Sequence, residues 1–256
     1  MSMLKTESLS IHFGGLKAVD QVNLEIQKGQ LFGLIGPNGA GKTTFFNLLT
    51  GVYRPTLGKI LFDGKDITST PTVERSHLGI RRTFQNIRLF KGLTVLENAL
   101  IAYDQKLSYS IFDTFALNKK FDSQEKVAAE KALSLLQLFQ LDRHVHEKAG
   151  DLPYGAQRKL EIIRTLMSDP KLILLDEPAA GMNHSETEQL MNLIRKVRDD
   201  FNLTVLLIEH DMKLVMGLCE QIAVLDYGVK IAQGAPQEVS RNPKVIEAYL
   251  GLEAES

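Results

Sequence analysis

Residues 31–49 read LFGLIGPNGAGKTTFFNLL, and this stretch decides the fold of the 256-residue chain. Gly36, Gly41, Lys42 and Thr43 match the phosphate-binding loop pattern G-x-x-x-x-G-K-S/T. The apolar run before the loop predicts a buried strand, and TTFFNLL after it predicts a helix. Glycines let successive backbone N–H groups face an anion, and the helix N-terminus adds positive potential. We therefore expect nucleotide phosphates to bind Gly36, Pro37, Asn38, Gly39, Ala40, Gly41, Lys42, Thr43 and Thr44.

A second apolar run, LILLDEP at residues 172–178, ends in two carboxylates. Carboxylates often flank strand ends, so this run is informative only beside the phosphate loop. There, Asp176 would complete a magnesium site with the Thr43 hydroxyl, while Lys42 reaches the β- and γ-phosphates. Glu177 would polarise a water for in-line attack on the γ-phosphate. These residues predict magnesium-dependent hydrolysis of a nucleoside triphosphate.

The periodicity of the chain predicts an α/β fold. Short β-like runs alternate with glycine-containing turns in the first 35 residues, and Asp63-Gly64 marks a hairpin within residues 59–68. Residues 125–139 have apolar side chains at helical spacing. After residue 170, apolar strands alternate with amphipathic helices, which predicts a parallel sheet covered on both faces. The core is thus interrupted by a mainly helical insertion.

The composition excludes several classes of protein. A formal net charge of −1 gives no overall basic field for nucleic acid, so we expect no such partner. The single cysteine, Cys219, excludes an intrachain disulfide, and its apolar neighbours favour a packing role over a catalytic thiol. We see neither a signal peptide nor an apolar run long enough to span a bilayer. We therefore expect a cytoplasmic chain that other subunits would hold at any membrane.

With these motifs the chain resembles the ATP-binding-cassette (ABC) ATPases over nearly its whole length. The resemblance implies a P-loop NTPase with a RecA-like parallel-sheet core, an N-terminal antiparallel β subdomain and an inserted α-helical subdomain. It implies one ABC domain over residues 1–256: about 1–85 and 161–235 form the nucleotide-binding core, about 86–160 the helical subdomain, and about 236–256 a C-terminal tail.

The resemblance also assigns three further residues to the site. Phe13 would stack on adenine, Gln85 would sense magnesium and link to the helical subdomain, and His210 would contact the γ-phosphate. The alternatives are a core aromatic at Phe13, a surface polar residue at Gln85 and a structural histidine at His210. The implied catalytic residues are thus Glu177, His210, Lys42 and Gln85, and the implied magnesium ligands are Thr43, Gln85 and Asp176.

Residues 151–158, DLPYGAQR, lie where this family carries its signature, LSGGQ, which faces ATP on a partner subunit. Leu152, Gly155 and Gln157 match, while Pro153 replaces the serine and Tyr154 the first glycine. The family's Ser-Ala-Leu-Asp turn appears as AGMN at residues 180–183. The helix start is retained, so its N–H groups can still face an anion. We expect a chain that hydrolyses ATP and offers a modified signature across an interface, an arrangement that suits an asymmetric heterodimer.

Four longer stretches, RTFQNIRLFKGLTVLENALIA, LPYGAQRKLEI, DEPAAGMN and IEHDMKLVMGLCE, resemble an ATPase subunit of bacterial high-affinity branched-chain amino acid importers. In that group the Tyr-Gly signature and Ala-Gly-x-Asn turn are usual, and NPKVIEAYLG near the C-terminus also fits. The implied partners are a second ABC ATPase subunit in a hetero- or homodimer, two transmembrane permease subunits and, indirectly, a periplasmic amino-acid-binding protein. The implied location is peripheral, on the cytoplasmic side of the inner membrane.

These residues leave the cargo and the docking surfaces open. The same motor could serve another cargo, such as urea or an envelope lipid, or the chain could be a soluble cassette protein of repair, translation or regulation. The aromatic residues of the insertion at about 104–123 could form a docking surface, although we favour a covering role for them. We expect the stretch from Asn86 to Leu96 to receive a helix of a membrane subunit.

Overall fold

A computed structural model describes residues 1–83, 87–103, 119–210 and 212–250. The chain divides into two compact units. The first comprises Met1–Arg82, Lys171–Pro178 and Thr187–Ser256, and the second comprises Thr83–Pro170 and Ala179–Glu186. Each unit has its own secondary structure and its own buried residues.

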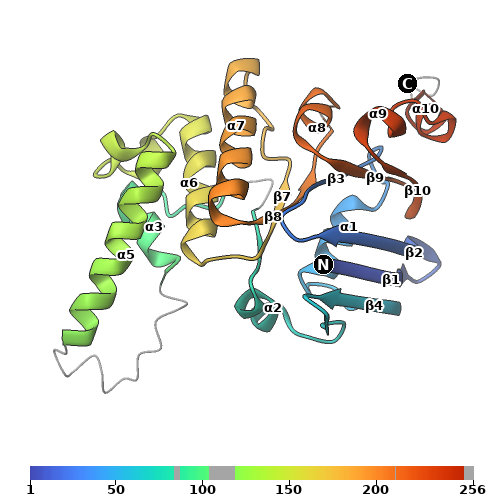
Figure 1. Ribbon diagram of the computed structural model, residues 1–256, viewed down its shortest axis with the longest axis horizontal. Helices are drawn as coiled ribbons and strands as arrows, with labels where there is room; N and C mark the ends of the chain where they lie inside the picture. Colours follow the sequence, from blue (N-terminus) through green and yellow to red (C-terminus); the bar gives the residue numbers. More distant parts are fainter. Residues whose placement is uncertain (84–86, 104–118, 211, 251–256) are drawn as a thin grey trace. The chain divides into compact units, whose positions relative to one another are not determined.

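The first unit contains a six-stranded sheet in the order β10-β9-β3-β8-β7-β6 (Figure 1). Its strands are β3 (Leu31–Ile35), β6 (Ile80–Arg82), β7 (Leu172–Asp176), β8 (Thr204–Ile208), β9 (Gln221–Asp226) and β10 (Val229–Gly234). All neighbours are parallel except β9 and β10. Every residue of β3, β7 and β8 is buried, which explains their continuous apolar sequences. The predicted parallel sheet is confirmed.

A second, antiparallel sheet of this unit has the order β2-β1-β4-β5. It consists of β1 (Ser2–Phe13), β2 (Leu16–Gln27), β4 (Leu57–Phe62) and β5 (Lys65–Asp66). Asp63 and Gly64 have φ angles of 49° and 79° between β4 and β5, as a tight type I′ hairpin turn requires. The predicted hairpin is confirmed.

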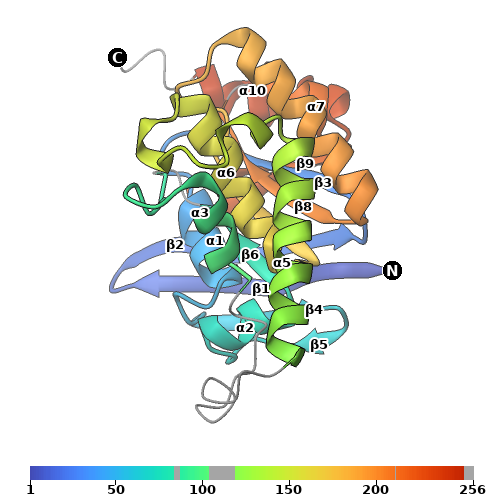
Figure 2. The same ribbon diagram turned by 90° about the vertical axis from the view of Figure 1, so that its left-hand side faces the viewer.

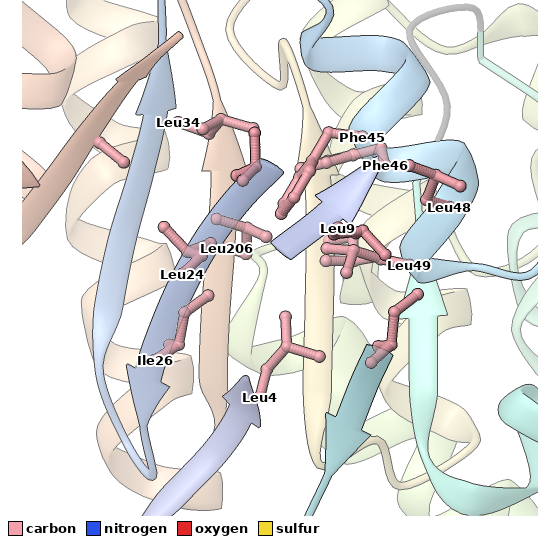
Figure 3. Packing of buried hydrophobic residues seen from close by; sticks show 14 of the residues in the cluster. Leu4, Leu9, Leu24, Ile26, Leu34, Phe45, Phe46, Leu48, Leu49 and Leu206 are labelled. Atoms are coloured by element: carbon pink, nitrogen blue, oxygen red, sulfur yellow. The ribbon is translucent and has the colours of Figure 1, made fainter. Parts of the chain in front are cut away.

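Helix α1 (Lys42–Leu49) packs into the core between these sheets. Figure 3 shows Phe45 and Phe46 of α1 beside apolar side chains of β1, β3 and β8, including Leu9, Leu34 and Leu206. All five of these side chains are fully buried. Because these side chains pack closely against one side of α1, the N-terminal end of the helix is fixed at the end of β3.

The remaining helices of the first unit are α2 (Thr72–Leu78), α7 (His184–Phe201), α8 (Met212–Leu218), α9 (Pro236–Val239) and α10 (Pro243–Leu250). The first residues of α7 belong to the second unit. Asn183 and Glu186 exchange two backbone-to-side-chain hydrogen bonds of 3.0 Å at the start of α7, which satisfies N–H groups at this helix end. None of the helices in the described part of the chain is long and apolar enough to cross a membrane.

The second unit is helical. Helices α3 (Val95–Ile101), α5 (Lys119–Leu138) and α6 (Tyr154–Met167) pack together (Figure 2), and short 3-10 turns occupy Asp142–His144 and Ala149–Asp151. Thr94 and Glu97 form a capping box that starts α3. Leu136 of α5 and Leu160 and Ile163 of α6 are fully buried. The helical pattern predicted at residues 125–139 is confirmed by α5.

Candidate functional site

The phosphate loop occupies residues 36–41, between β3 and α1. Gly36 has a φ of 149°, and a Cβ atom there would lie 2.1 Å from the Leu225 carbonyl oxygen. Gly41 has a φ of 96°, and a Cβ atom there would lie 2.4 Å from the Ala18 carbonyl oxygen. Only glycine fits either position, because both the backbone angle and the neighbouring backbone exclude a side chain. The loop is therefore shaped by β9 and β2 as well as by its own sequence.

The N-terminus of α1 is suited to an anion. No side chain caps it, and no acidic residue lies in its first turn. The first N–H groups of a helix have no intrahelical partner, and the helix dipole makes this end positive. Residues Asn38 to Thr44 line a cavity of about 360 Å³ together with Leu16, Lys17, Ala18, Glu177, Ile208, Tyr227 and Gly228. The cavity thus combines an anion-binding loop with one carboxylate and several apolar side chains.

The Lys42 ammonium is buried within the loop. Its Nζ donates hydrogen bonds to the carbonyl oxygens of Gly36, at 2.6 Å, and Pro37, at 2.7 Å. Burial lowers the pKa of Lys42, and the charges of Glu177 and Asp176 act in the opposite direction. The negative charge of a bound phosphate would offset the free-energy cost of burying this ammonium. Lys42 is therefore a buried hydrogen-bond donor within the loop, bonded to two backbone carbonyl oxygens.

Asp176 ends β7 and forms a buried ion pair with Arg82 of β6. Arg82 Nη2 lies 2.6 Å from Asp176 Oδ2, and Arg82 Nη1 donates a 2.6 Å hydrogen bond to Asn47 Oδ1 of α1. The guanidinium also lies 5.5 Å from the centre of the Phe46 ring. The sequence reasoning missed Arg82, and only the pairing of β6 with β7 brings it beside Asp176.

Glu177 follows β7 in a left-handed backbone conformation, with a φ of 46°. Such angles are uncommon for residues other than glycine and occur at functional sites. The Glu177 N–H donates a 2.9 Å hydrogen bond to the Ile208 carbonyl oxygen, so β8 holds the residue in place. Its side chain lines the cavity and is about one-fifth exposed. This carboxylate can reach both bound ligand and water.

His210 lies just beyond β8 and is mainly exposed. Its Nδ1 is 3.7 Å from Glu177 Oε1 and 3.9 Å from Glu209 Oε2. Glu209 is buried, and its Oε2 accepts a 3.2 Å hydrogen bond from the His210 N–H. The structure thus brings His210 and Glu177 together at the carboxyl ends of two neighbouring strands.

Phe13, expected against the base, ends β1 and is 46% exposed. Its ring packs edge-to-face on Tyr53, with centroids 5.3 Å apart. The large apolar side chains that line the cavity are Leu16, Ile208 and Tyr227, and Tyr227 is 82% exposed. The sequence reasoning did not select Leu16 or Tyr227, because only the fold places the β9–β10 turn beside the phosphate loop.

The predicted signature segment belongs to the second unit. Pro153 is the N-cap of α6, Leu152 is buried, and Gln157 Nε2 donates a 2.8 Å hydrogen bond to the Leu152 carbonyl oxygen. Tyr154 begins the helix and is 44% exposed. The helix start expected here is confirmed, and its first turn is tied to the preceding loop.

The Tyr154 ring lies on the turn at residues 180–183. A Cβ atom at Gly181 would be 3.3 Å from Tyr154 Cε1, and Gly181 has a φ of 76°. Arg158 Nη2 donates a 3.3 Å hydrogen bond to the Tyr154 hydroxyl, and the fully buried Arg158 pairs with Glu161 at 2.8 Å. The two unusual segments of the sequence are therefore in contact within one unit.

Two predicted elements lie wholly or mainly outside the described residues: Gln85 and the insertion at about 104–123. Of the predicted docking stretch, residues 87–96 are described. There, Arg164 donates a hydrogen bond to the Arg88 carbonyl oxygen, and its guanidinium lies 5.1 Å from the centre of the half-exposed Phe90 ring. Asn98 fixes the loop through bonds of 2.9 and 3.0 Å to the Phe90 backbone. This part of the stretch is an exposed loop that is hydrogen-bonded to α3 and α6.

Cys219 is buried beside Gly33, and burial raises the pKa of its thiol to about 12. The expected packing role is confirmed.

In the described part of the chain, no three His, Cys, Asp or Glu side chains gather closely enough to hold a metal ion alone.

Comparison with known proteins gives two matching family models. Residues 19–180 match the model for ABC transporters, and residues 229–255 match one for branched-chain amino acid ATP-binding cassette transporters. The chain is 46% identical over 249 residues to the high-affinity branched-chain amino acid transport ATP-binding protein BraF of Pseudomonas aeruginosa. It is 45% identical to the corresponding protein LivG of Escherichia coli, and each match covers 97% of this chain and 98% of the relative.

Solved structures agree with this similarity. A nucleotide-free ATP-binding cassette from an ABC transporter superposes with a TM-score of 0.83 at 34% identity, covering 97% of this chain and 99% of that one. A dimeric cassette in a post-hydrolysis state with ADP and phosphate superposes with a TM-score of 0.76 at 25% identity, covering 91% and 99%. The predicted fold class is thereby confirmed.

Proposed function

We propose, from the premise that this chain belongs to the ABC transporter family of ATPases, that it is the ATP-hydrolysing subunit of an importer for branched-chain amino acids. The observation that carries the proposal is the 46% identity to a branched-chain amino acid transport ATPase over 97% of the chain. The second family match, at residues 229–255, supports the same cargo class.

ATP would bind with its phosphates on the loop at residues 36–41 and the N-terminus of α1. Backbone N–H groups and Lys42 would carry this interaction. Lys42 Nζ would exchange its two carbonyl partners for β- and γ-phosphate oxygens. Because the ammonium is buried, its attraction to the phosphates is screened less than that of a surface lysine.

The oxygen donors of Thr43 and Asp176 fit Mg²⁺. This ion needs only one or two protein ligands, because it retains waters and binds substrate phosphates. When bound, it neutralises charge on the β- and γ-phosphate oxygens. Arg82 bonds one carboxylate oxygen of Asp176, and Asp176 would hold the metal together with Thr43. Gln85 remains a proposed further ligand.

Glu177 would orient and polarise the attacking water, and His210 would contact the γ-phosphate. Both side chains follow neighbouring parallel strands and lie 3.7 Å apart. In-line attack needs such groups held in fixed positions, because positioning and charge stabilisation supply most of the catalysis in phosphoryl transfer. The strand-held backbone of Glu177 supports this role.

A second ABC ATPase subunit would complete the functional dimer. The N-terminus of α6, with Pro153, Tyr154 and Gly155, would face ATP bound by that partner. The modified signature supports an asymmetric heterodimer. ATP binding would close the two subunits, and hydrolysis with product release would reopen them.

Two permease subunits would hold this dimer on the cytoplasmic side of the inner membrane, and a periplasmic protein would deliver the amino acid.

The surface around Arg88 and Phe90 is the proposed docking site for a permease helix. Arg88→Glu should impair transport and assembly. ATP binding should be retained, because Arg88 lies in the second unit and the phosphate loop lies in the first. Unchanged transport would remove this surface from the proposal.

The testing experiment is affinity capture of the tagged chain from gently solubilised host membranes, followed by mass spectrometry and reconstitution. We expect two multi-span proteins, a second cassette ATPase, and ATP-dependent uptake of leucine, isoleucine and valine. Glu177→Gln should abolish uptake in the same vesicles. Recovery of envelope-lipid or urea machinery would retain the motor and refute the cargo, whereas recovery only with ribosomes or nucleic acid would refute transport.

A further inference from the structure

The turn between β9 and β10 carries an exposed aromatic side chain that neither the core nor the turn requires. Tyr227 and Gly228 form this turn, with φ angles of 43° and 80°. Asparagine or glycine suits a left-handed first position far better than tyrosine does. Tyr227 is 82% exposed and so contributes little to the core. Tyr227 therefore leaves most of its aromatic surface available to a ligand.

The turn is fixed to the phosphate loop and to β2. The Gly228 N–H donates a 3.0 Å hydrogen bond to the Ala40 carbonyl oxygen, and the Gly228 carbonyl oxygen accepts a 2.8 Å bond from Asp20 N–H. A Cβ atom at Gly228 would lie 2.9 Å from the carbonyl oxygens of both Lys17 and Ala18. These hydrogen bonds hold the backbone next to Tyr227 against the phosphate loop and β2.

Tyr227 lines the same cavity as Lys42 and Thr43. Leu16, which is 66% exposed, also lines it and directly precedes the Lys17–Ala18 backbone against which the turn packs. The cavity therefore offers a cationic loop for an anion and, from two adjoining segments, exposed apolar surface. A nucleotide has the matching composition, because it joins a polyphosphate to an aromatic base.

We propose that Tyr227 forms an aromatic wall of the base-binding end of this cavity and stacks on the base of the bound nucleotide. The inference rests on the proposed function in that the ligand is a nucleoside triphosphate. It adds a binding residue to the one expected at Phe13, whose ring packs edge-to-face on Tyr53. Stacking on an aromatic ring is tolerant of base identity, so Tyr227 strengthens binding of ATP and GTP alike.

The test compares nucleotides with inorganic tripolyphosphate, which has the phosphates and lacks the base. Tyr227→Asn removes the ring and suits the left-handed turn better, so this variant retains the fold. We expect its dissociation constants for ATP and GTP to rise about tenfold and that for tripolyphosphate to stay the same. Tyr227→Phe should bind all three as the wild type does, because it retains the ring.

A fluorescence measurement gives an independent reading, because the chain contains no tryptophan. Tyr227→Trp introduces a single reporter whose emission should change on addition of ATP and stay constant with tripolyphosphate. Phe201→Trp, at the C-terminal end of α7, is the matched control, since Phe201 is also exposed but does not line the cavity. Its emission should respond to neither ligand.

Three outcomes would overturn the inference. Equal weakening of ATP and tripolyphosphate in Tyr227→Asn would mean that the residue acts through the phosphate loop. Unchanged ATP affinity in Tyr227→Asn, with a loss in Phe13→Ala, would assign the base to Phe13 alone. Wild-type protein that bound neither ATP nor tripolyphosphate would refute the proposed function, and the inference with it.

Discussion

Arg75 is a buried cation that holds the far end of the phosphate-loop helix. It lies in α2 and is 1% exposed. Its guanidinium donates five hydrogen bonds of 2.6–3.0 Å to the carbonyl oxygens of Leu48, Leu49, Ile67, Thr68 and Thr70. Two of these carbonyls belong to the last turn of α1, where the helix dipole is negative. Arg75→Met should therefore release both the end of α1 and the loop at residues 67–70.

The expected loss follows from these contacts. Hydrogen bonds from a charged donor contribute about 1.5 kcal/mol each, so five contribute roughly 7 kcal/mol. Burial of the cation opposes this gain and lowers the pKa of Arg75 to about 10, so desolvation offsets part of it. Arg75→Met should thus lower the free energy of unfolding by about 4 kcal/mol. Arg75→Lys, which keeps the charge but has three donors, should lose about half as much.

Thermal unfolding followed by far-UV circular dichroism measures this difference. For a chain of this size, a loss of 4 kcal/mol lowers Tm by roughly 8–16 °C. Arg54→Met is the matched control, because Arg54 is exposed, and its Tm should change by no more than about 2 °C. An Arg75→Met protein that unfolds within about 2 °C of the wild type would show that the five bonds do not stabilise the fold.

Four further predictions concern the cavity and the contact between Tyr154 and Gly181. Glu177→Gln should lower ATP turnover of the assembled complex at least about 100-fold with unchanged ATP affinity; undiminished phosphate release would remove Glu177 from catalysis. Lys42→Met should weaken ATP binding about 10- to 100-fold by calorimetry. Because burial lowers the Lys42 pKa, wild-type affinity should decline with rising pH before an ordinary lysine would titrate; affinity constant to the usual lysine range would contradict this. Gly181→Leu should destabilise the chain, and Tyr154→Gly should recover at least about 1 kcal/mol of that loss in the double variant; strictly additive free energies would disprove the contact.

Sequence patterns were sufficient for the features that depend on local conformation. The strand, glycine-containing loop and helix of residues 31–49, the parallel strands, the Asp63-Gly64 hairpin and the start of α6 were all predicted, and each is confirmed. These features depend on periodicity, glycine and turn residues within a short window of chain. The burial of Cys219 followed from the same reasoning, because its neighbours are apolar.

The contacts that the sequence did not reveal join segments far apart in the chain. Arg82 and Asp176 are separated by 94 positions and meet only because β6 and β7 are neighbours. Gly41 must be glycine because the Ala18 backbone approaches it, and Tyr227 reaches the cavity because its turn is bonded to Ala40. No pattern within a single window contains such information, since the strand order that creates these contacts is a property of the whole sheet.

The two departures from the family pattern, at Tyr154 and at Gly181, are in contact in the fold. Tyr154 in the signature and Gly181 in the following turn look like separate losses, of a glycine and of a side chain. In the fold the Tyr154 ring occupies the space that a side chain at residue 181 would fill, and Arg158, four residues further along α6, donates a hydrogen bond to its hydroxyl. One substitution therefore accommodates the other. Because this contact joins the start of α6 to the turn after Glu177, a change at either residue should act on both.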